Sequence, residues 1–160
     1  MEIVRLTNEN AHDFGQVICD SWGETYRGLI PDEILDNRKA ERWTERARLS
    51  PEGKYLAYAD GRAVGAIGFL KQARDFCTHR QSCEIVCLYV LKEFHRRGIG
   101  RALMEKAFAD LGDRDITLFV LKGNDNAAGF YEHMGFEFTG RELDEGGMTE
   151  LEMFRKAGVL

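Results

Sequence analysis

The sequence predicts a single α/β (α+β) domain over residues 1–160, in which helices flank a mixed β-sheet, and three observations lead to this prediction. The length of 160 residues fits one ordinary domain. Stretches with the two-residue period of strands alternate with stretches that have the period of helices. Hairpin patterns lie in the middle and at the end of the chain, so the sheet must contain antiparallel strands. The predicted order is β-α-α-β-β-β-α-β-α-β-β.

The first part of the chain is predicted to form a strand and two helical stretches. Residues 2–6 have strand character. Apolar residues then recur at helical spacing, which predicts an amphipathic helix over about 9–27; they are Phe14, Val17, Ile18, Trp22 and Tyr26. Pro31 suits the first turn of a helix, where its missing N–H is not needed. It begins a second helical stretch whose apolar positions are Ile34, Leu35, Ala40, Trp43 and Ala47.

Three strands are predicted next. Residues 54–59 and 63–71 are strand-like, and the Asp60-Gly61 pair between them is a strong hairpin pattern. Residues 72–81 are polar and show no periodicity, so they are predicted to form a loop. Residues 83–91 are rich in β-branched and other apolar residues and predict a further strand.

The last part of the chain alternates between helix and strand. A helix is predicted from Ile99 to about Gly112, followed by a strand over 116–121. Asn124 is a plausible N-cap for another helix, and Gly135 suits the position just after its end. Two strands, 136–143 and 148–155, are then joined around Gly146-Gly147.

Composition excludes several classes of function. The chain has 22 Lys and Arg against 27 Asp and Glu, and the net charge of −5 disfavours nucleic-acid binding. The basic run from Arg38 to Arg48 alternates with acidic residues and is interpreted as a solvated helix face. No run reaches the ~18 apolar residues of a membrane span, and no signal peptide is recognised. We expect a cytoplasmic protein without nucleic-acid or membrane partners.

The cysteine pattern predicts free thiols and no metal site. The four cysteines are Cys19, Cys77, Cys83 and Cys87, and they form no C-x-x-C pair. A covalent acetyl-cysteine intermediate on Cys83 or Cys87 is a second interpretation. Because no histidine lies at a suggestive spacing, we expect these cysteines to serve packing.

The segment from His95 to Arg101 carries the clearest chemical pattern. Two glycines flank the start of a predicted helix, and three arginines lie in the same turn. A helix N-terminus leaves backbone N–H groups unpaired, and glycines let the backbone approach an anion. The segment therefore predicts a pyrophosphate cradle, although neither G-x-x-x-x-G-K-[ST] nor G-x-G-x-x-G is present. A tight turn with solvated arginines is the alternative.

Two motifs resemble one family. His95-Arg96-Arg97-Gly98-Ile99-Gly100 resembles the [Arg/Gln]-x-x-Gly-x-[Gly/Ala] signature of the GNAT superfamily of acetyl-CoA-dependent N-acetyltransferases. Residues 124–136 are similar to that family's Asn-x-x-Ala-x-x-Phe-Tyr-x-x-x-Gly-Phe. Both motifs in this order are strongly specific, and the resemblance covers essentially the whole chain. His95 departs from the usual Arg or Gln, which puts only that side-chain contact in doubt.

The resemblance implies the GNAT fold, with a mostly antiparallel sheet, and acetyl-CoA as co-substrate. Leu88, Tyr89 and Val90 would offer backbone groups to the acetyl and pantetheine parts. The pyrophosphate would be held by His95, Arg96, Arg97, Gly98, Ile99, Gly100 and Arg101. Asn124 would bond the cofactor, Tyr131 would lie near the thioester sulfur, and His133 would face the adenine or ribose-phosphate end. Many members are homodimers, and we expect the same here on the resemblance alone.

The implied chemistry needs a base and an acid. An alkyl amine has a pKa of ~10.4 and is mostly protonated at neutral pH, so a base must remove its proton, directly or through water. Glu84 is the predicted base, because several GNAT members place a glutamate at the matching strand position. An edge residue in water is the alternative for Glu84, and His79 is a rival base. Tyr131 is the predicted acid for the departing thiolate; a core aromatic is its alternative.

The acceptor site is predicted from Ser21–Pro31, which is similar to a Trp-x-x-x-Tyr-x-Gly-x-x-Pro stretch in a bacterial GNAT group with polyamine-acetylating members. Trp22 and Tyr26 share one helix face and would wall an amine pocket by cation–π contact. Glu84, and Glu24 as a counter-charge, would complete it. The alternative for both aromatics is packing against the sheet.

The function predicted from the sequence is transfer of acetyl from acetyl-CoA to a primary amine, by direct attack in a ternary complex. The acceptor is expected to be a polyamine or another small amine. Three alternatives remain open at this point. They are a non-catalytic acyl-CoA-binding or sensing module of the same fold, an acetyltransferase for peptide N-termini or lysine side chains, and a nucleotide-binding protein unrelated to acetyl transfer.

Overall fold

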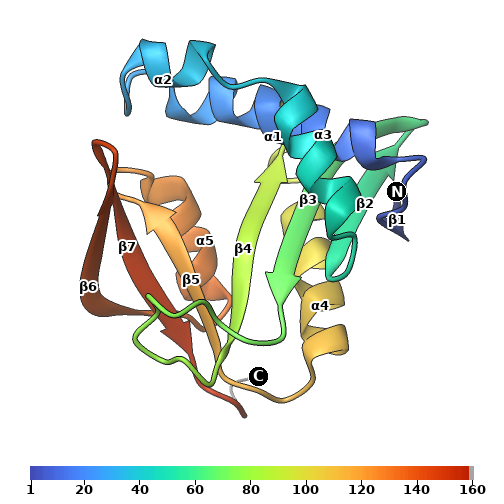
Figure 1. Ribbon diagram of the computed structural model, residues 1–160. Coiled ribbons are helices and arrows are strands. Elements are labelled where there is room, and N and C mark those ends of the chain that lie inside the picture. Colours follow the sequence, from blue (N-terminus) through green and yellow to red (C-terminus); the bar gives the residue numbers. More distant parts are fainter. Residues whose placement is uncertain (159–160) are drawn as a thin grey trace. The chain divides into compact units, whose positions relative to one another are not determined.

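The computed structural model describes residues 1–158 (Figure 1). The strands have the order β1-β2-β3-β4-β5-β7-β6; β4 pairs with β5 in parallel, whereas β1–β2, β2–β3, β5–β7 and β6–β7 are antiparallel. The predicted mixed, mostly antiparallel sheet is confirmed. In chain order the elements are β1 (Glu2–Arg5), α1 (Ala11–Tyr26), α2 (Asp32–Asp36), α3 (Ala40–Leu49), β2 (Lys54–Ala59), β3 (Arg62–Leu70), β4 (Cys83–Val90), the short 3₁₀ helix η1 (Lys92–Phe94), α4 (Ile99–Leu111), β5 (Ile116–Leu121), α5 (Asp125–His133), β6 (Glu137–Glu145) and β7 (Met148–Arg155).

The predicted element order is wrong at one place. The second helical stretch is two helices, α2 and α3, so three helices separate β1 from β2. α2 ends because Asn37 closes it, with its side-chain amide donating to the Glu33 carbonyl at 2.9 Å. Lys39 is extended (φ −117°, ψ 135°) and redirects the chain before α3. The apolar pattern misses this break because both short helices bury their apolar side.

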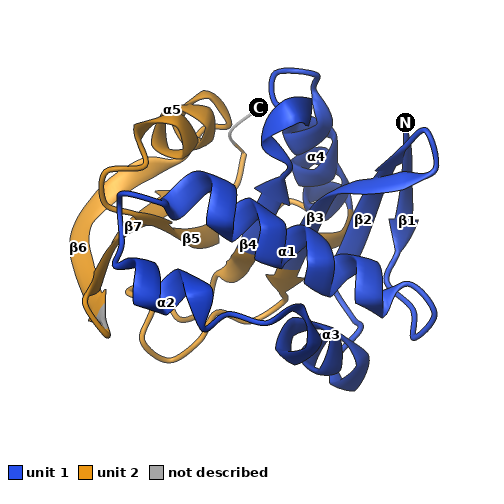
Figure 2. Ribbon diagram, turned by 90° about the horizontal axis from the view of Figure 1, so that it is seen from above, with its two compact units in different colours: residues 1–68, 87–109 blue, residues 69–86, 110–160 orange. Residues whose placement is uncertain are grey.

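The chain divides into two compact units, coloured separately in Figure 2. The first unit contains residues 1–68 and 87–109. The second contains residues 69–86 and those from 110 onward. β4 contributes its first residues to the second unit and its last residues to the first.

Helices cover both faces of β3 in the first unit. A Cβ added at Gly65 would lie 3.0 Å from Leu103 and 3.1 Å from Ile99, both in α4. A Cβ at Gly68 would lie 4.0 Å from Phe14 of α1. Residues three apart in a strand point to opposite faces, so α4 and α1 pack on opposite sides. The missing side chain at Gly65 lets α4 lie close against the strand.

Glycine also permits the close packing of α1 and α3. A Cβ at Gly15 would lie 2.3 Å from the Thr44 hydroxyl oxygen and 2.5 Å from the Ala40 carbonyl oxygen. The Thr44 hydroxyl donates to that same carbonyl at 3.0 Å. The two helices therefore meet at a point where no side chain fits.

The second unit contains α5, the helix whose two ends the sequence predicts. The Asn124 side chain accepts a hydrogen bond from the Ala127 backbone N–H, which confirms the N-cap of α5. Gly135, with φ of 87°, follows the end of the helix as predicted. β5 and β7 then pair along six residues each, from Ile116 with Arg155 to Leu121 with Glu150.

The cysteines and the surface agree with the composition. Cys77 and Cys83 are buried and Cys19 and Cys87 half-buried, and all four are free thiols, as predicted.

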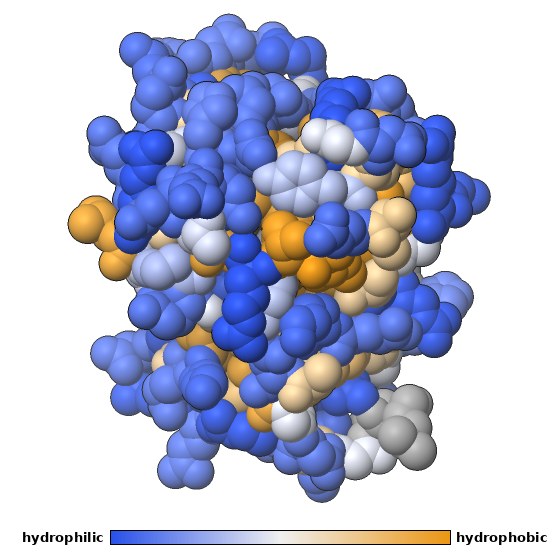
Figure 3. Space-filling model, turned by 90° about the vertical axis from the view of Figure 1, so that its right-hand side faces the viewer, coloured by the Kyte–Doolittle hydropathy of each residue, from blue (hydrophilic) through white to orange (hydrophobic). Residues whose placement is uncertain are grey.

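Within residues 1–158 no helix has the length and apolar character needed to cross a membrane. The face drawn in Figure 3 is mostly hydrophilic, with apolar side chains gathered near its middle.

Two glycines of α1 provide a matched test of the packing between α1 and α3. Gly15→Ala should lower the free energy of unfolding by about 1–3 kcal/mol, because its methyl group overlaps Thr44 and Ala40. Gly23→Ala should raise it by about 0.5–1 kcal/mol, since a Cβ there meets nothing within 4 Å. Urea unfolding of both variants measures the difference. Equal effects of the two substitutions would contradict the close packing.

Candidate active site

The turn before α4 has the backbone shape of an anion cradle. Arg96 (φ 59°) and Gly98 (φ 78°) both adopt the left-handed conformation, and α4 begins at Ile99. Left-handed residues within a turn direct successive N–H groups into one concavity, where the helix dipole adds positive charge. A Cβ at Gly98 would meet nothing within 4 Å, so space above the turn is open. These backbone angles are compatible with the predicted pyrophosphate segment, which stays a prediction.

His95 ties this turn to the end of β4. Its Nε2 lies 2.8 Å from the carbonyl oxygen of Val90. A carbonyl can only accept, so Nε2 carries the proton and donates it. The residue that departs from the family signature therefore orients the last carbonyl of Leu88–Val90, the segment predicted to contact the acetyl and pantetheine parts.

The three arginines of the turn have different surroundings. Arg101 is paired with Glu105 at 2.8 Å, one helical turn away. Arg97 lies over the Phe94 ring, 5.0 Å from its centroid. Arg96 is exposed, and among residues 1–158 its side chain has no hydrogen bond or ion pair. Within the described part of the chain, Arg96 and Arg97 thus have no carboxylate partner that competes with an anion.

The predicted acceptor pocket is already occupied by a cation of the chain. Trp22 and Tyr26 do share one face, with ring centroids 4.7 Å apart and nearly perpendicular planes. The guanidinium carbon of Arg38 lies only 3.3 Å from the Trp22 ring centroid. The interpretation of Arg38 as part of a solvated helix face is therefore wrong: it lies between α2 and α3 and covers the indole.

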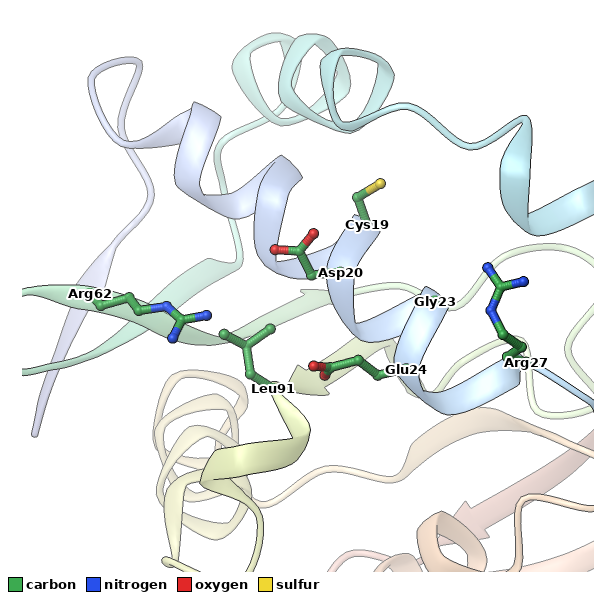
Figure 4. A pocket seen from close by; sticks show the side chains of 7 residues that line it. All are labelled: Cys19, Asp20, Gly23, Glu24, Arg27, Arg62 and Leu91. Carbon is green, nitrogen blue, oxygen red and sulfur yellow. The ribbon is translucent and has the colours of Figure 1, made fainter. Parts of the chain in front are cut away.

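Glu24 does not lie beside this aromatic pair. Residues two apart in a helix point to nearly opposite sides, which separates Glu24 from Trp22. Its carboxylate accepts a hydrogen bond from the Lys92 backbone N–H at 2.8 Å. Figure 4 shows Glu24, Asp20 and Arg62 gathered around Leu91, where they line a cavity of about 390 Å³ in the first unit. The predicted counter-charge therefore belongs to another place on α1.

Glu84, the predicted base, is buried and ion-paired in the second unit. Its side chain is 0% exposed, so the alternative of an edge residue in water is wrong. The Arg74 guanidinium donates to it from Nε at 3.0 Å and from a terminal nitrogen at 2.5 Å. The Arg74 backbone N–H donates at 3.0 Å to the other carboxylate oxygen. Arg74 belongs to the predicted loop 72–81.

A second carboxylate, Glu152 of β7, is buried under the same loop. It accepts hydrogen bonds from the Thr78 backbone N–H at 2.7 Å and the Thr139 hydroxyl at 2.8 Å. Burial alone raises the pKa of Glu152. The hydrogen bonds from Thr78 and Thr139, with the charge of Arg141, outweigh burial and hold the pKa below its usual value. Two buried acids thus lie under one polar loop.

The other predicted site residues of the second unit lie on α5, at its N-terminal end and in loop 72–81. Tyr131 is buried on α5, with its ring 5.4 Å from that of Phe130 and 6.0 Å from that of Phe136. The Asn124 side-chain oxygen serves the helix cap, and its amide N–H groups have no hydrogen-bond partner among the described residues. His79, the rival base, stacks on Phe154 at 3.9 Å between ring centroids. His133 binds the Gly129 carbonyl within its own helix.

The Cys83 thiol does not favour a covalent intermediate, and Cys77 shares its surroundings; the same alternative for Cys87 stays untested. Burial raises the pKa of Cys77 to about 11, assisted by the charge of Glu84 and a hydrogen bond to it. Burial also raises the pKa of Cys83. A thiol is a nucleophile only as its thiolate, so neither group is activated at neutral pH.

Comparison with known proteins decides the family. The profile of the Acetyltransferase (GNAT) family matches residues 16–136. An uncharacterized N-acetyltransferase of Archaeoglobus fulgidus is 32% identical over 135 residues, which are 82% of this chain and 89% of that protein. The chain belongs to the GNAT acetyltransferase family.

Other relatives agree with this assignment. Spermidine N(1)-acetyltransferase of Thermoplasma acidophilum is 25% identical over 146 residues, covering 86% of this acetyltransferase and 88% of that protein. The crystal structure of PaiA N-acetyltransferase from Thermoplasma acidophilum in complex with coenzyme A has a TM-score of 0.72. At 22% identity it covers 97% of this chain and 98% of that one. The predicted GNAT fold is confirmed.

Sequence reasoning missed three charged residues of this GNAT acetyltransferase. Arg74 and Glu152 acquire their roles only through loop 72–81, which has no periodicity to interpret. Glu152 alternates with Leu151 and Met153 along β7, a pattern typical of a solvent-facing residue. Arg38 lies in a basic run, and nothing in the sequence distinguishes it from the solvated arginines of that run. No local pattern identifies any of the three.

Glu152 should make stability dependent on acid. Because the pKa of Glu152 is lower in the folded protein than in the unfolded chain, where it is ~4.3, its carboxylate stabilises the fold fully at pH values above that unfolded pKa. This stabilisation is lost as the pH falls through the pKa of the folded state. Glu152→Gln should lower the free energy of unfolding by about 1–3 kcal/mol at pH 7. Between neutral and acidic pH, this variant should then lose less stability than the unsubstituted protein. Urea unfolding across pH measures both. The exposed Glu137→Gln is the control; an equal loss in both variants would contradict the assignment.

Proposed function

We propose that this protein transfers the acetyl group of acetyl-CoA to a primary amine of a small molecule, by direct attack in a ternary complex. The observation that carries the proposal is the turn of His95–Arg101, with left-handed Arg96 and Gly98 at the start of α4. Its backbone N–H groups suit a pyrophosphate, and acetyl-CoA is the typical acyl donor of the GNAT family.

The residues present fit acetyl-CoA, which supplies an activated acetyl thioester when bound. The turn would hold the pyrophosphate through backbone N–H groups, and the exposed Arg96 would add charge. Leu88, Tyr89 and Val90 would offer backbone groups along the pantetheine arm, with the Val90 carbonyl held by His95. The Asn124 amide would donate hydrogen bonds, because only its oxygen is used in the cap.

Glu84 is proposed to receive the proton of the acceptor ammonium. Both of its oxygens already accept hydrogen bonds from Arg74. Direct transfer would require that pairing to loosen, so we propose that the proton passes through water. Arg74, whose side chain is 45% exposed, would stabilise the carboxylate between turnovers. Tyr131 is proposed to protonate the departing thiolate; its buried ring environment supports a defined orientation.

The acceptor is proposed as a small amine, and two observations bear on its class. The similarity to a spermidine acetyltransferase supports a polyamine. The Arg38 guanidinium on the Trp22 ring disfavours a polyamine at that place, because like charges repel. Release of coenzyme A thiol from acetyl-CoA, measured with polyamines, aminoglycosides, amino acids and short peptides, tests the function. Absence of release with every class would contradict an enzyme of small amines.

The two ends of α4 offer a matched test of the cradle. Gly98 (φ 78°) and Gly112 (φ 72°) are both left-handed, and a Cβ at either meets nothing within 4 Å. Alanine should therefore cost similar backbone strain at both, about 1 kcal/mol. Only Gly98→Ala should weaken acetyl-CoA binding, by about tenfold or more. Calorimetric titration measures this, and equal affinities of the two variants would refute the cradle.

Substitutions of the proposed acid, Tyr131, and of the proposed base, Glu84, should have different kinetic effects. Tyr131→Phe should lower kcat by about 10²-fold or more while the affinity for acetyl-CoA stays unchanged. Glu84→Gln should lower kcat at neutral pH and shift the rate profile toward higher pH, where more acceptor is already neutral. Tyr58→Phe, which loses only the hydrogen bond to Asp13, is the control. Full turnover by Tyr131→Phe would exclude it as the acid.

A further inference from the structure

Buried hydrogen-bond donors around Trp22 lack acceptors within residues 1–158. The indole Nε1–H of Trp22, the Nε–H of Arg38 and the hydroxyl of Ser21 are buried and have no hydrogen-bond partner. Trp22 itself is only 9% exposed. Buried polar groups in native proteins nearly always have a partner, which is a protein group, an ordered water or a ligand, so these donors mark a place where a hydrogen-bond acceptor can bind.

Two of these donors are neighbours on one aromatic platform. Nε of Arg38 is bonded to the guanidinium carbon, which lies 3.3 Å from the centroid of the indole that contains Nε1. The Cys19 thiol donates to the Arg38 backbone carbonyl at 3.5 Å, which ties this residue to α1. The rings of Tyr26 and Tyr89 lie 4.7 Å and 6.4 Å from that of Trp22. The donors thus lie in a region with three aromatic rings.

The charge at this place is positive and unbalanced. Arg38 is half-buried and makes no ion pair with any carboxylate among residues 1–158. Burial lowers the pKa of Arg38, and the like charges of Arg42 and Arg46 act in the same direction. The phenols of Tyr89 and Tyr26 act in the opposite direction. A half-buried guanidinium without a counter-ion is costly, and an anionic ligand would remove that cost.

We propose that Trp22 and Arg38, beside the rings of Tyr26 and Tyr89, bind the carboxylate of the acyl acceptor, so that the preferred substrates are amino acids. A carboxylate is planar, accepts several hydrogen bonds and matches the guanidinium fork. A polyamine would instead bring a further positive charge to Arg38. This inference rests on the proposed function, whose acceptor it names more closely.

The test compares acceptors that differ only in the carboxylate. Lysine and ornithine are measured beside cadaverine and putrescine, their decarboxylated forms, and beside lysinamide; other amino acids are paired with their decarboxylated amines in the same way. At least one amino acid should exceed its partner in kcat/KM by about tenfold or more, the value of one charge-assisted hydrogen-bonded pair. Equal or better use of diamines or spermidine would overturn the proposal and leave the acetyltransferase function intact.

Variants of Arg38 separate recognition from structure. Arg38→Gln should raise KM for the amino acid by about tenfold, leave kcat unchanged and leave KM for the diamine unchanged or lower. Arg38→Lys should recover part of the effect, because it keeps the charge but loses the fork. Arg48→Gln, an exposed arginine of α3, is the control. Equal effects of Arg38→Gln on amino acid and diamine would overturn the proposal.

Two further measurements identify the anion that Arg38 binds. If that anion is a phosphate of coenzyme A, Arg38→Gln will weaken acetyl-CoA binding in calorimetry, which would overturn the acceptor assignment. If no acceptor is turned over, the proposed function fails. The carboxylate site is then tested separately, by titrating amino acids into the protein saturated with coenzyme A. Binding that is lost in Arg38→Gln would still support the carboxylate site, and absence of binding would overturn it.

Discussion

A charge taken out of water must be matched by hydrogen bonds or by an opposite charge, and this constraint governs the interior of the protein. Glu84 meets it through Arg74, and Glu152 meets it through Thr78 and Thr139. The polar loop 72–81 is therefore a structural part of the second unit, because it supplies most of these partners. Arg38 is the contrasting case, since no carboxylate answers its charge within the described residues.

The same constraint connects structure with function. A buried carboxylate that is fully hydrogen-bonded is well oriented but poorly accessible to a proton, which is why a route through water suits Glu84. A guanidinium with spare donors is the opposite, because it is free to recognise an anion. The difference between these sites separates a residue that would act on the amine from one that would select the acceptor.

Glycine residues determine where the backbone packs closely and where it turns. Gly15 and Gly65 allow α3 and α4 to approach α1 and β3 more closely than any side chain permits. Gly98 has a different use, since its surroundings are open and its positive φ is what matters. One residue type thus brings elements together at two places and shapes the turn proposed as an anion cradle at a third, and only the surroundings tell these uses apart.

The sequence by itself determined the strands, most of the helices, the Asn124 cap and the glycine turn at residues 95–101, because periodicity, capping and turn chemistry are properties of neighbouring residues. It did not reveal the break between α2 and α3, where two short helices share one apolar pattern. Only the tertiary structure decided the partners of the charged residues. Arg38 stacks on an indole sixteen positions earlier in the sequence, and Glu152 binds Thr78 across 74 residues. Such pairs depend on how distant segments pack, and local sequence carries no record of that packing.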